Sequence, residues 1–344
     1  MNKTRAQLPT TFFRAILATA AAIWGLGFVI GKGAIAEIGA TWFTAIRFIG
    51  SGFVLLIILF PHFKCHLNRS LVKAGCIIGV FSFLGFWTQF LGLGMTTPSK
   101  NAFLSACYCL TVPLIWWVVA RRRPSKRICL AAIACTIGIG LVSLSDSFSI
   151  GAGDAMSIVS AFAYGTEIVV ISLVMKDHDV LSITVVQQFT SGILASVLAL
   201  ATAPIPTAEQ IAQPWLLGAM AYVIFLAAAF GSVAQNLAQA HVSASEAGLL
   251  CSLESVFCAI FSVTLLNENL TLKMAAGFIL IFASIIVAQL SEGKGEQAIQ
   301  DVSEKRAFEK RKNVRDLPSP LSANRPQPSP TAICLRMRQV SRCS

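Results

Sequence analysis

Three charged side chains lie deep inside long apolar segments of the sequence: Arg47, Glu167 and Glu254. A charge near the centre of a membrane-spanning helix costs roughly +2.5 kcal/mol or more, so such residues usually face a cavity or a partner. The guanidinium fork of Arg47 could bind a carboxylate or a phosphate through two parallel hydrogen bonds. The structural alternatives for Arg47 are snorkelling and a fixed ion pair.

The two carboxyl groups are candidates for binding protons. Glu254 lies about ten residues into its apolar segment, near the expected bilayer midplane, where an unpaired carboxylate is destabilised until it takes up a proton. The hypothesis is that Glu254 links proton release to the opening of a cavity; the alternative is a neutral carboxyl hydrogen-bonded between helices. Glu167 follows Tyr164 by three residues, so both are predicted on one helix face, which we expect to be exposed to the cavity.

Neutral side chains complete the candidate site. Gln89 and Gln235 occupy matching positions in the two sequence halves described below and could line one cavity, although hydrogen bonding between helices is the commoner role of such residues. Trp24 could form an apolar cavity wall, with simple packing as the alternative. The candidate substrate-cavity residues are therefore Trp24, Arg47, Gln89, Tyr164, Glu167, Gln235 and Glu254.

The elements that must position these residues are apolar segments long enough to cross a bilayer. Hydrophobic residues make up 55% of the 344 residues and charged residues 12%, against roughly 25% charged residues in soluble domains. Each segment approaches the roughly 20 residues that a transmembrane helix needs, and none has the alternating period of a membrane β-barrel. The sequence predicts an all-α integral membrane protein with ten transmembrane helices, at 15–35, 41–60, 71–94, 100–120, 128–145, 154–175, 182–203, 214–240, 244–266 and 270–290.

The first apolar segment has some features of a signal peptide. Basic residues precede it, and it ends in Ala34-Ile35-Ala36, which resembles a signal-peptidase site. We expect no cleavage, because the segment is longer than a signal-peptide core and has a counterpart in the second half of the chain. The ten cysteines are scattered, without a Cys-x-x-Cys motif, so we expect no disulfide framework, no metal site and no cofactor.

Basic residues predict the orientation of the helices. If the N-terminus is cytoplasmic, the opposite side of the membrane holds only Lys32, Lys100 and Lys273. This asymmetry follows the positive-inside rule and places both termini in the cytoplasm, with the plasma (inner) membrane as the expected location. The net charge of +11 therefore requires no nucleic-acid partner. The expected cytoplasmic basic residues are Lys3, Arg5, Arg14, Lys64, Arg69, Lys73, Arg121, Arg122, Arg123, Lys126, Arg127 and Lys176.

Polar segments flank the predicted helices at both ends of the chain. Residues 1–14 are expected to form a cytoplasmic N-terminal segment. Residues 291–344 are rich in Lys, Arg, Ser and Pro and lack an apolar face, so they are predicted to be a disordered cytoplasmic tail.

The two halves of the sequence are weakly similar to each other, at an offset of 145 to 146 residues over most of their length. Two halves of five spans, 15–145 and 154–290, are therefore predicted. Because five is odd, the halves have opposite orientations, an architecture of secondary transporters in which the substrate site lies between the halves and access alternates. The matching segments are Gln89-Phe90-Leu91-Gly92 with Gln235-Asn236-Leu237-Ala238, Ala102-Phe103-Leu104 with Ala247-Gly248-Leu249, and, at offset 140, Ile23-Trp24-Gly25 with Ala163-Tyr164-Gly165.

Several short motifs carry a further resemblance. They are Ser99-Lys100-Asn101-Ala102-Phe103-Leu104, Val112-Pro113-Leu114, Arg122-Arg123-Pro124-Ser125-Lys126-Arg127, Gly153-Asp154, Ser252-Leu253-Glu254-Ser255-Val256-Phe257 and Leu266-Asn267-Glu268-Asn269-Leu270-Thr271. With these motifs, roughly residues 12 to 290 resemble the EamA family of the drug/metabolite transporter superfamily. The resemblance implies two inverted five-helix repeats, with a central cavity lined by the first four helices of each half. Two residues depart from the family pattern: Ser255 replaces a usual proline, and Glu167 stands where a neutral, aromatic or histidine side chain is expected.

These observations predict a secondary transporter of a small polar metabolite, such as an amino acid, an organic acid, an amine or a drug-like compound. Its expected partners are that substrate, the lipid bilayer and, under the Glu254 hypothesis, protons. The alternatives are a membrane channel or receptor and an integral membrane enzyme. An enzyme would need clustered ligands or acids at the membrane surface, and only Lys176-Asp177-His178-Asp179 comes near. No Walker-type motif indicates an ATP-driven pump.

Overall fold

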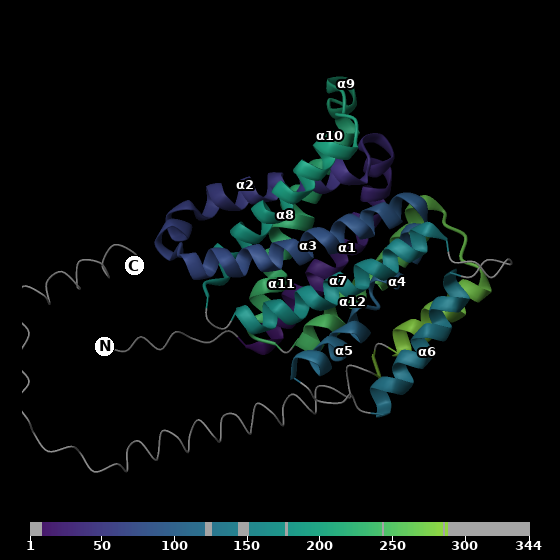
Figure 1. Ribbon diagram of the computed structural model, residues 1–344. Coiled ribbons are helices and arrows are strands. Elements are labelled where there is room, and N and C mark those ends of the chain that lie inside the picture. Colours follow the sequence, from purple (N-terminus) through teal and green to yellow (C-terminus); the bar gives the residue numbers. More distant parts are fainter. Residues whose placement is uncertain are drawn as a thin grey trace, which may run out of the picture.

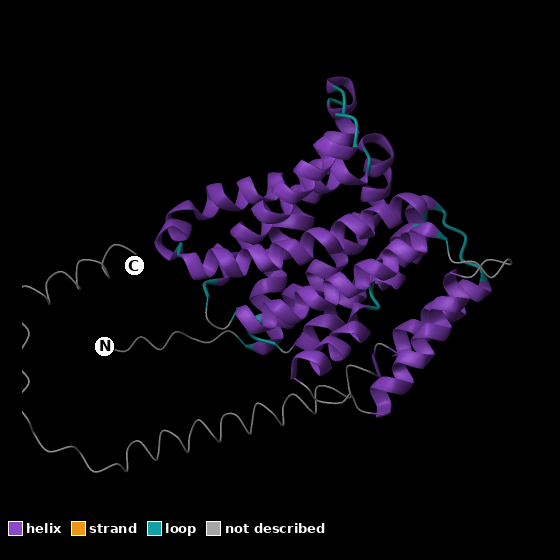
Figure 2. Ribbon diagram, in the orientation of Figure 1, coloured by secondary structure: helices purple, strands orange, loops and turns teal. Residues whose placement is uncertain are grey.

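The computed structural model describes residues 9–120, 126–143, 151–175, 178–242, 244–284 and 286–287. Within these ranges every regular element is a helix (Figure 2). Eight helical segments are long and apolar enough to cross a membrane. The elements are α1 (Thr10–Ile38), α2 (Ala40–His66), α3 (Arg69–Met95), α4 (Pro98–Ser105), α5 (Tyr108–Ala120), α6 (Lys126–Ser143), α7 (Ala152–Val174), α8 (Val180–Thr202), α9 (Ala208–Ile211), α10 (Pro214–Ala221), η1 (Tyr222–Phe230), α11 (Gly231–Gln239) and α12 (Ala244–Leu266).

Two shorter apolar helical segments, Cys129–Gly138 and Leu272–Ser284, lie where the fifth and tenth spans were predicted. They pack against each other, because a Cβ atom at Gly138 would lie 2.7 Å from Ile281 Cγ1 and 3.0 Å from the Gly277 carbonyl oxygen. Residues 144–150 and 288–290, at the ends of these two predicted spans, lie outside the described residues. The predicted N-terminal segment, apart from its last few residues, and the predicted tail lie outside them as well.

The first two helices are longer than the predicted spans 15–35 and 41–60, since α1 begins at Thr10 and α2 ends at His66. An apolar sequence identifies only the part of a helix that lies in the membrane, whereas the helical backbone hydrogen bonds continue into the polar residues on either side. A single residue, Gly39, joins the two helices. Its φ of 76° lies in the region that glycine adopts without steric cost, so the chain reverses there in one step.

Two predicted spans are not continuous α-helices. The span predicted at 100–120 breaks into α4 and α5 at Ala106 and Cys107, about six residues before Pro113. The span predicted at 214–240 consists of α10, the π-helix η1 and α11. Wide π-turns are rare and often occur at functional sites. In η1 the side chain of Gln188 from α8 donates to the Ala228 carbonyl oxygen at 3.1 Å, which satisfies a backbone acceptor in the middle of the bundle.

The long helices pack as pairs that combine the two halves of the sequence: α1 with α12, α2 with α8, and α3 with α7 (Figure 1). Glycines permit the closest approaches. A Cβ atom at Gly25 of α1 would lie 2.9 Å from the Glu254 carbonyl oxygen and 2.6 Å from Phe257 Cβ of α12. At the matching position of the second half, a Cβ atom at Gly165 would lie 3.0 Å from Thr111 Cβ of α5.

Polar contacts join the helices at the end of the bundle where α3 terminates. Lys32 donates to the carbonyl oxygens of Leu93 at 2.8 Å and of Gly94 at 3.0 Å, so a cation stabilises the carboxyl end of α3. At the same end Lys100 forms an ion pair with the buried carboxylate of Asp154 at 2.9 Å. These contacts connect α1 with α3 and the start of α4 with the start of α7.

The crossing of α1 and α12 gives a direct test of this packing. Gly25→Ala should destabilise the protein by about 1–3 kcal/mol, because the new methyl group overpacks the contact with α12. Thermal unfolding of the detergent-solubilised protein, followed by size-exclusion chromatography, measures the effect. Gly218→Ala is the matched control, since nothing lies within 4 Å of a Cβ atom there. Equal stability of the two variants would contradict the packing.

Candidate functional site

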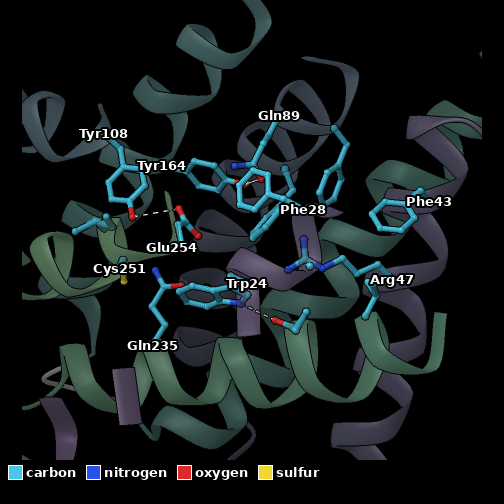
Figure 3. A pocket seen from close by; sticks show the side chains of 16 residues that line it. Trp24, Phe28, Phe43, Arg47, Gln89, Tyr108, Tyr164, Gln235, Cys251 and Glu254 are labelled. Atoms are coloured by element: carbon cyan, nitrogen blue, oxygen red, sulfur yellow. Dashed lines mark hydrogen bonds between the residues drawn. The ribbon is translucent and has the colours of Figure 1, made fainter. Parts of the chain in front are cut away.

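A pocket lies in the centre of the bundle, between helices from both halves of the chain (Figure 3). It is lined by α1, α2, α3 and α5 from the first half and by α7, η1, α11 and α12 from the second, whereas α8 contributes no lining residue. Aromatic rings form much of its wall. The lining side chains that carry polar atoms are Trp24, Arg47, Gln89, Tyr108, Tyr164, Gln235, Cys251 and Glu254.

Arg47 is the cationic group of the pocket, and its side chain is only 2% exposed. Its guanidinium carbon lies 3.8 Å from the ring centroid of Phe86 and 5.3 Å from that of Phe90. Among the described residues no carboxylate lies within ion-pair distance of Arg47, and its Nε has no hydrogen-bond partner. Cation–π contacts stabilise a desolvated guanidinium by about 2 kcal/mol. They leave its donors available for an anion.

Glu254 lies across the pocket from Arg47 (Figure 3). Its carboxylate accepts a hydrogen bond from the hydroxyl of Tyr108 at 3.3 Å. The break between α4 and α5 places Tyr108 at the first position of α5, and the Gly25 contact holds the backbone of α12 at Glu254 against α1. Glu254 is 8% exposed as a residue and forms no ion pair within the described part of the chain.

Gln89 is held in one orientation by its neighbours. Its Oε1 accepts a hydrogen bond from the Tyr164 hydroxyl at 2.7 Å, and its Nε2 donates to the Ser105 hydroxyl at 3.0 Å. The side chain of Asn101 also donates to the backbone carbonyl of Gln89 at 3.0 Å. Because both ends of its amide are occupied, Gln89 positions Tyr164 in the pocket wall more readily than it binds a ligand.

Trp24 and Gln235 line the pocket in different ways. The indole of Trp24 donates to the Ala227 carbonyl of η1 at 2.8 Å, so its ring is fixed and presents an apolar surface. The amide of Gln235, from α11, forms no hydrogen bond with the described residues and points into the pocket (Figure 3). Gln235 is therefore a free donor and acceptor beside Glu254 and Trp24.

The structure places Glu167 away from the pocket lining. Its carboxylate accepts hydrogen bonds from the Ser82 hydroxyl and from Gln187 Nε2, the latter at 3.1 Å. The network continues because Asn236 donates to Gln187 Oε1 at 2.7 Å. Glu167 and Tyr164 are both buried on α7, but Glu167 faces α3 and α8, whereas Tyr164 lies in the pocket wall.

The pocket thus brings together six of the seven residues proposed from the sequence, all except Glu167. Tyr108 was missed, although a signal for it exists. It precedes Glu254 by 146 residues, one more than the offset of 145 between Ala102 and Ala247, so the two hydrogen-bonded side chains lie one residue from equivalent positions in the two halves. The aromatic residues around Arg47 were also missed, because their proximity arises from the packing of α2 against α3.

The arrangement has the chemistry of a binding site. A guanidinium lies at one side, a carboxyl group with a tyrosine hydroxyl lies at the other, and aromatic rings fill the space between them. Among the described residues, no group of three metal-ligating side chains lies in this pocket. The described geometry therefore fits a small amphipathic molecule with an anionic group.

Comparisons with known proteins agree with the architecture. The model of the EamA-like transporter family matches residues 14–144 and 151–289. An uncharacterized transporter from Archaeoglobus fulgidus is 30% identical over 274 residues, which cover 80% of this chain and 84% of that protein. A solved crystal structure shares the fold, with a TM-score of 0.61 and 14% sequence identity over 81% of this chain and 96% of that one. The protein is thus an integral membrane protein with two matching halves, and it belongs to the EamA-like transporter family.

Proposed function

We propose that the protein is a secondary transporter that carries a small organic anion through the central pocket by alternating access. The observation that carries the proposal is the buried guanidinium of Arg47, which lines the pocket and has no carboxylate partner among the described residues. A buried charge is usually paired or hydrogen-bonded. The missing partner would be supplied by the carboxylate or phosphate of the substrate, which a guanidinium binds in bidentate geometry.

The rest of the pocket supports a substrate with an apolar body. The rings of Trp24, Phe28 and Phe90 would contact that body. The free amide of Gln235 and the carboxyl of Glu254 would recognise a polar or amino group at the other end, so organic acids and amino acids are the preferred candidates among polar metabolites.

The helix contacts support ten helices in two inverted repeats. The equivalent spans are α1 and α7, α2 and α8, α3 and the α10–η1–α11 span, and α4–α5 and α12. When each span is exchanged for its equivalent, the contact of α3 with α7 becomes the contact of α11 and η1 with α1. Both contacts exist. The contact of α1 with α12 likewise becomes that of α7 with α4 and α5, which also exists, while the contact of α2 with α8 maps onto itself. Rocking one half against the other would expose the pocket alternately to each side.

Glu254 is the proposed site of proton coupling. Its carboxyl group has a single hydrogen-bond donor, the weakly placed Tyr108 hydroxyl at 3.3 Å, and no cation within ion-pair distance among the described residues. An ionised carboxylate is destabilised in such surroundings. It would hold a proton while the pocket is closed and release it when water enters, which would link proton movement to substrate movement.

Uptake into proteoliposomes tests the role of Arg47. A screen over amino acids, organic acids, nucleosides and amines should identify compounds with an anionic group, with saturation and counter-transport. Arg47→Gln should lower uptake of these compounds by roughly 10- to 100-fold, since hydrogen bonds to charged groups contribute about 1.5–3 kcal/mol each. Arg47→Lys should lose less activity, because it keeps the charge but not the fork.

Arg69→Gln is the matched control for Arg47, because Arg69 is an exposed residue at the start of α3, away from the pocket. This variant should transport at the wild-type rate. Uptake at the wild-type rate by a folded Arg47→Gln variant would contradict the proposal that Arg47 binds an anionic substrate. Flux without saturation or counter-transport would instead indicate a channel.

Proton coupling is tested by substitutions that replace a carboxyl group with an amide of similar size, which cannot ionise. Glu254→Gln should abolish the stimulation of uptake by a pH gradient, whereas exchange between equal pools on both sides should persist, because the variant can still bind substrate. Glu167→Gln, a change in the network with Ser82 and Gln187, should retain the stimulation. If the outcomes are reversed, Glu167 is the coupling residue.

The proposed orientation places both termini in the cytoplasm of a cell whose plasma (inner) membrane holds the protein. Reporter fusions test it by sidedness. A fusion at Glu296, which lies outside the described residues, should report a cytoplasmic location. A fusion at Glu209, on the exposed short helix α9, should report the opposite side. Either signal on the wrong side contradicts the orientation.

A further inference from the structure

Three potential metal ligands gather at the end of the bundle where α2 terminates, and none of them lines the pocket. His62 and His66 are four residues apart in the last turns of α2, so their side chains share one face of the helix. Asp179 is the N-cap of α8, the helix that packs along α2. The ligand atoms of the three residues all lie within 4.8 Å of one another.

Hydrogen bonds orient two of these groups as metal ligands. His66 Nδ1 lies 2.9 Å from the His62 carbonyl oxygen, which can only accept a hydrogen bond. Nδ1 therefore carries the proton, and Nε2 of His66 presents its lone pair. A backbone carbonyl that fixes the tautomer in this way is the usual outer partner of a metal-binding histidine. His62 presents its Nε2 to Asp179 Oδ2, at 2.9 Å.

The carboxylate of Asp179 is held in place by hydrogen bonds from Ser182 and His62. The backbone nitrogen of Ser182 donates to Oδ2 at 2.9 Å. The cluster is open to solvent, since the His62 side chain is 40% exposed and that of Asp179 is 23% exposed, so an ion can reach it.

We propose that His62, His66 and Asp179 bind a divalent transition-metal ion of the Zn²⁺ class. Imidazole nitrogens favour zinc, nickel and copper over magnesium and calcium, which prefer oxygen ligands. Tetrahedral zinc has bonds of about 2.0 Å to nitrogen and oxygen, so its ligand atoms are roughly 3.3 Å apart. The observed ligand atoms all lie within 4.8 Å of one another, so they would approach by at most about 1.5 Å to reach the zinc spacing. The ion takes the place of the Nε2 proton of His62, which is transferred through water to Nδ1 of the same ring, so that the neutral imidazole binds through Nε2. Water occupies the fourth position.

The proposed site has a structural consequence. Its two histidines come from the first half of the chain and its aspartate from the second, so a bound ion would cross-link the two halves at the end of the α2–α8 pair. The sequence analysis predicted no metal site, because it relied on the cysteines, which form no metal-binding motif. His62 and His66 form a three-ligand group only together with Asp179, the N-cap of α8.

Calorimetric titration of the purified full-length protein in detergent with ZnCl₂ tests the proposal. The wild type should bind about one ion at the site. His66→Gln should weaken that binding by at least roughly 10- to 100-fold, because loss of a residue that only supports a metal ligand already has an effect of this size. Asp179→Asn should weaken it similarly while preserving the helix cap, because asparagine caps helices as well as aspartate does. MgCl₂ at the same concentration should give no competition.

His241→Gln is the matched control, since His241 also presents its Nδ1 to a backbone carbonyl, that of Leu237 at 2.9 Å, but belongs to no ligand group within the described chain. It should bind zinc as the wild type does. Titration with Co²⁺ distinguishes the ligands: visible bands without a thiolate charge-transfer band support His and Asp. Unchanged binding by His66→Gln and Asp179→Asn, thiolate bands alone, or no binding by the wild type would each overturn the proposal.

Discussion

Lipid offers no hydrogen bonds to a polar side chain, and this constraint decides where the polar groups of the described helices lie. Many hydroxyl groups bond back to their own helix, as Thr44 does to the Ala40 carbonyl and Ser157 to the Gly153 carbonyl, both at 2.7 Å. Large apolar side chains such as Ile57, which is 75% exposed, cover the outside of the bundle. Polar side chains too large for such local bonding face the interior, where they form networks between helices or line the pocket.

The pocket combines wall residues from equivalent positions of the two matching halves with an asymmetric set of charges. Equivalent positions of the two halves supply Trp24 and Tyr164 to its wall, and Gln89 and Gln235 as well. The guanidinium of Arg47 has no basic counterpart, because the matching region of α8 contains Gln187 and Gln188, whose amides bond within the bundle. A substrate that places its anionic group at Arg47 would therefore bind in a single orientation. In the proposed mechanism, the two matching halves would supply the two access states, and the unequal charges would supply the selectivity.

The sequence predicts the elements of this fold better than their local geometry. Apolar length located the eight long helices, since transfer into lipid depends on composition, and the internal repeat identified Gln89 with Gln235 as a pair. The distribution of apolar residues does not show which backbone hydrogen bonds a helix forms, so the break at Ala106 and the π-helix η1 were not predicted from it. The direction of Glu167 depends on donors from Ser82 and Gln187 on two other helices, and a single-helix pattern contains no information about them. The binding role of all the candidate residues stays a prediction.

The central claim is that the substrate supplies the missing anion of Arg47. An experimental structure of the wild-type protein with a transported organic acid bound is its most direct test. The account predicts that the acid group lies within hydrogen-bond distance of the Arg47 guanidinium, with the guanidinium still stacked on Phe86. A bound acid whose anionic group lies elsewhere, with Arg47 paired instead to the carboxylate of Glu167 or Glu254, would contradict the account.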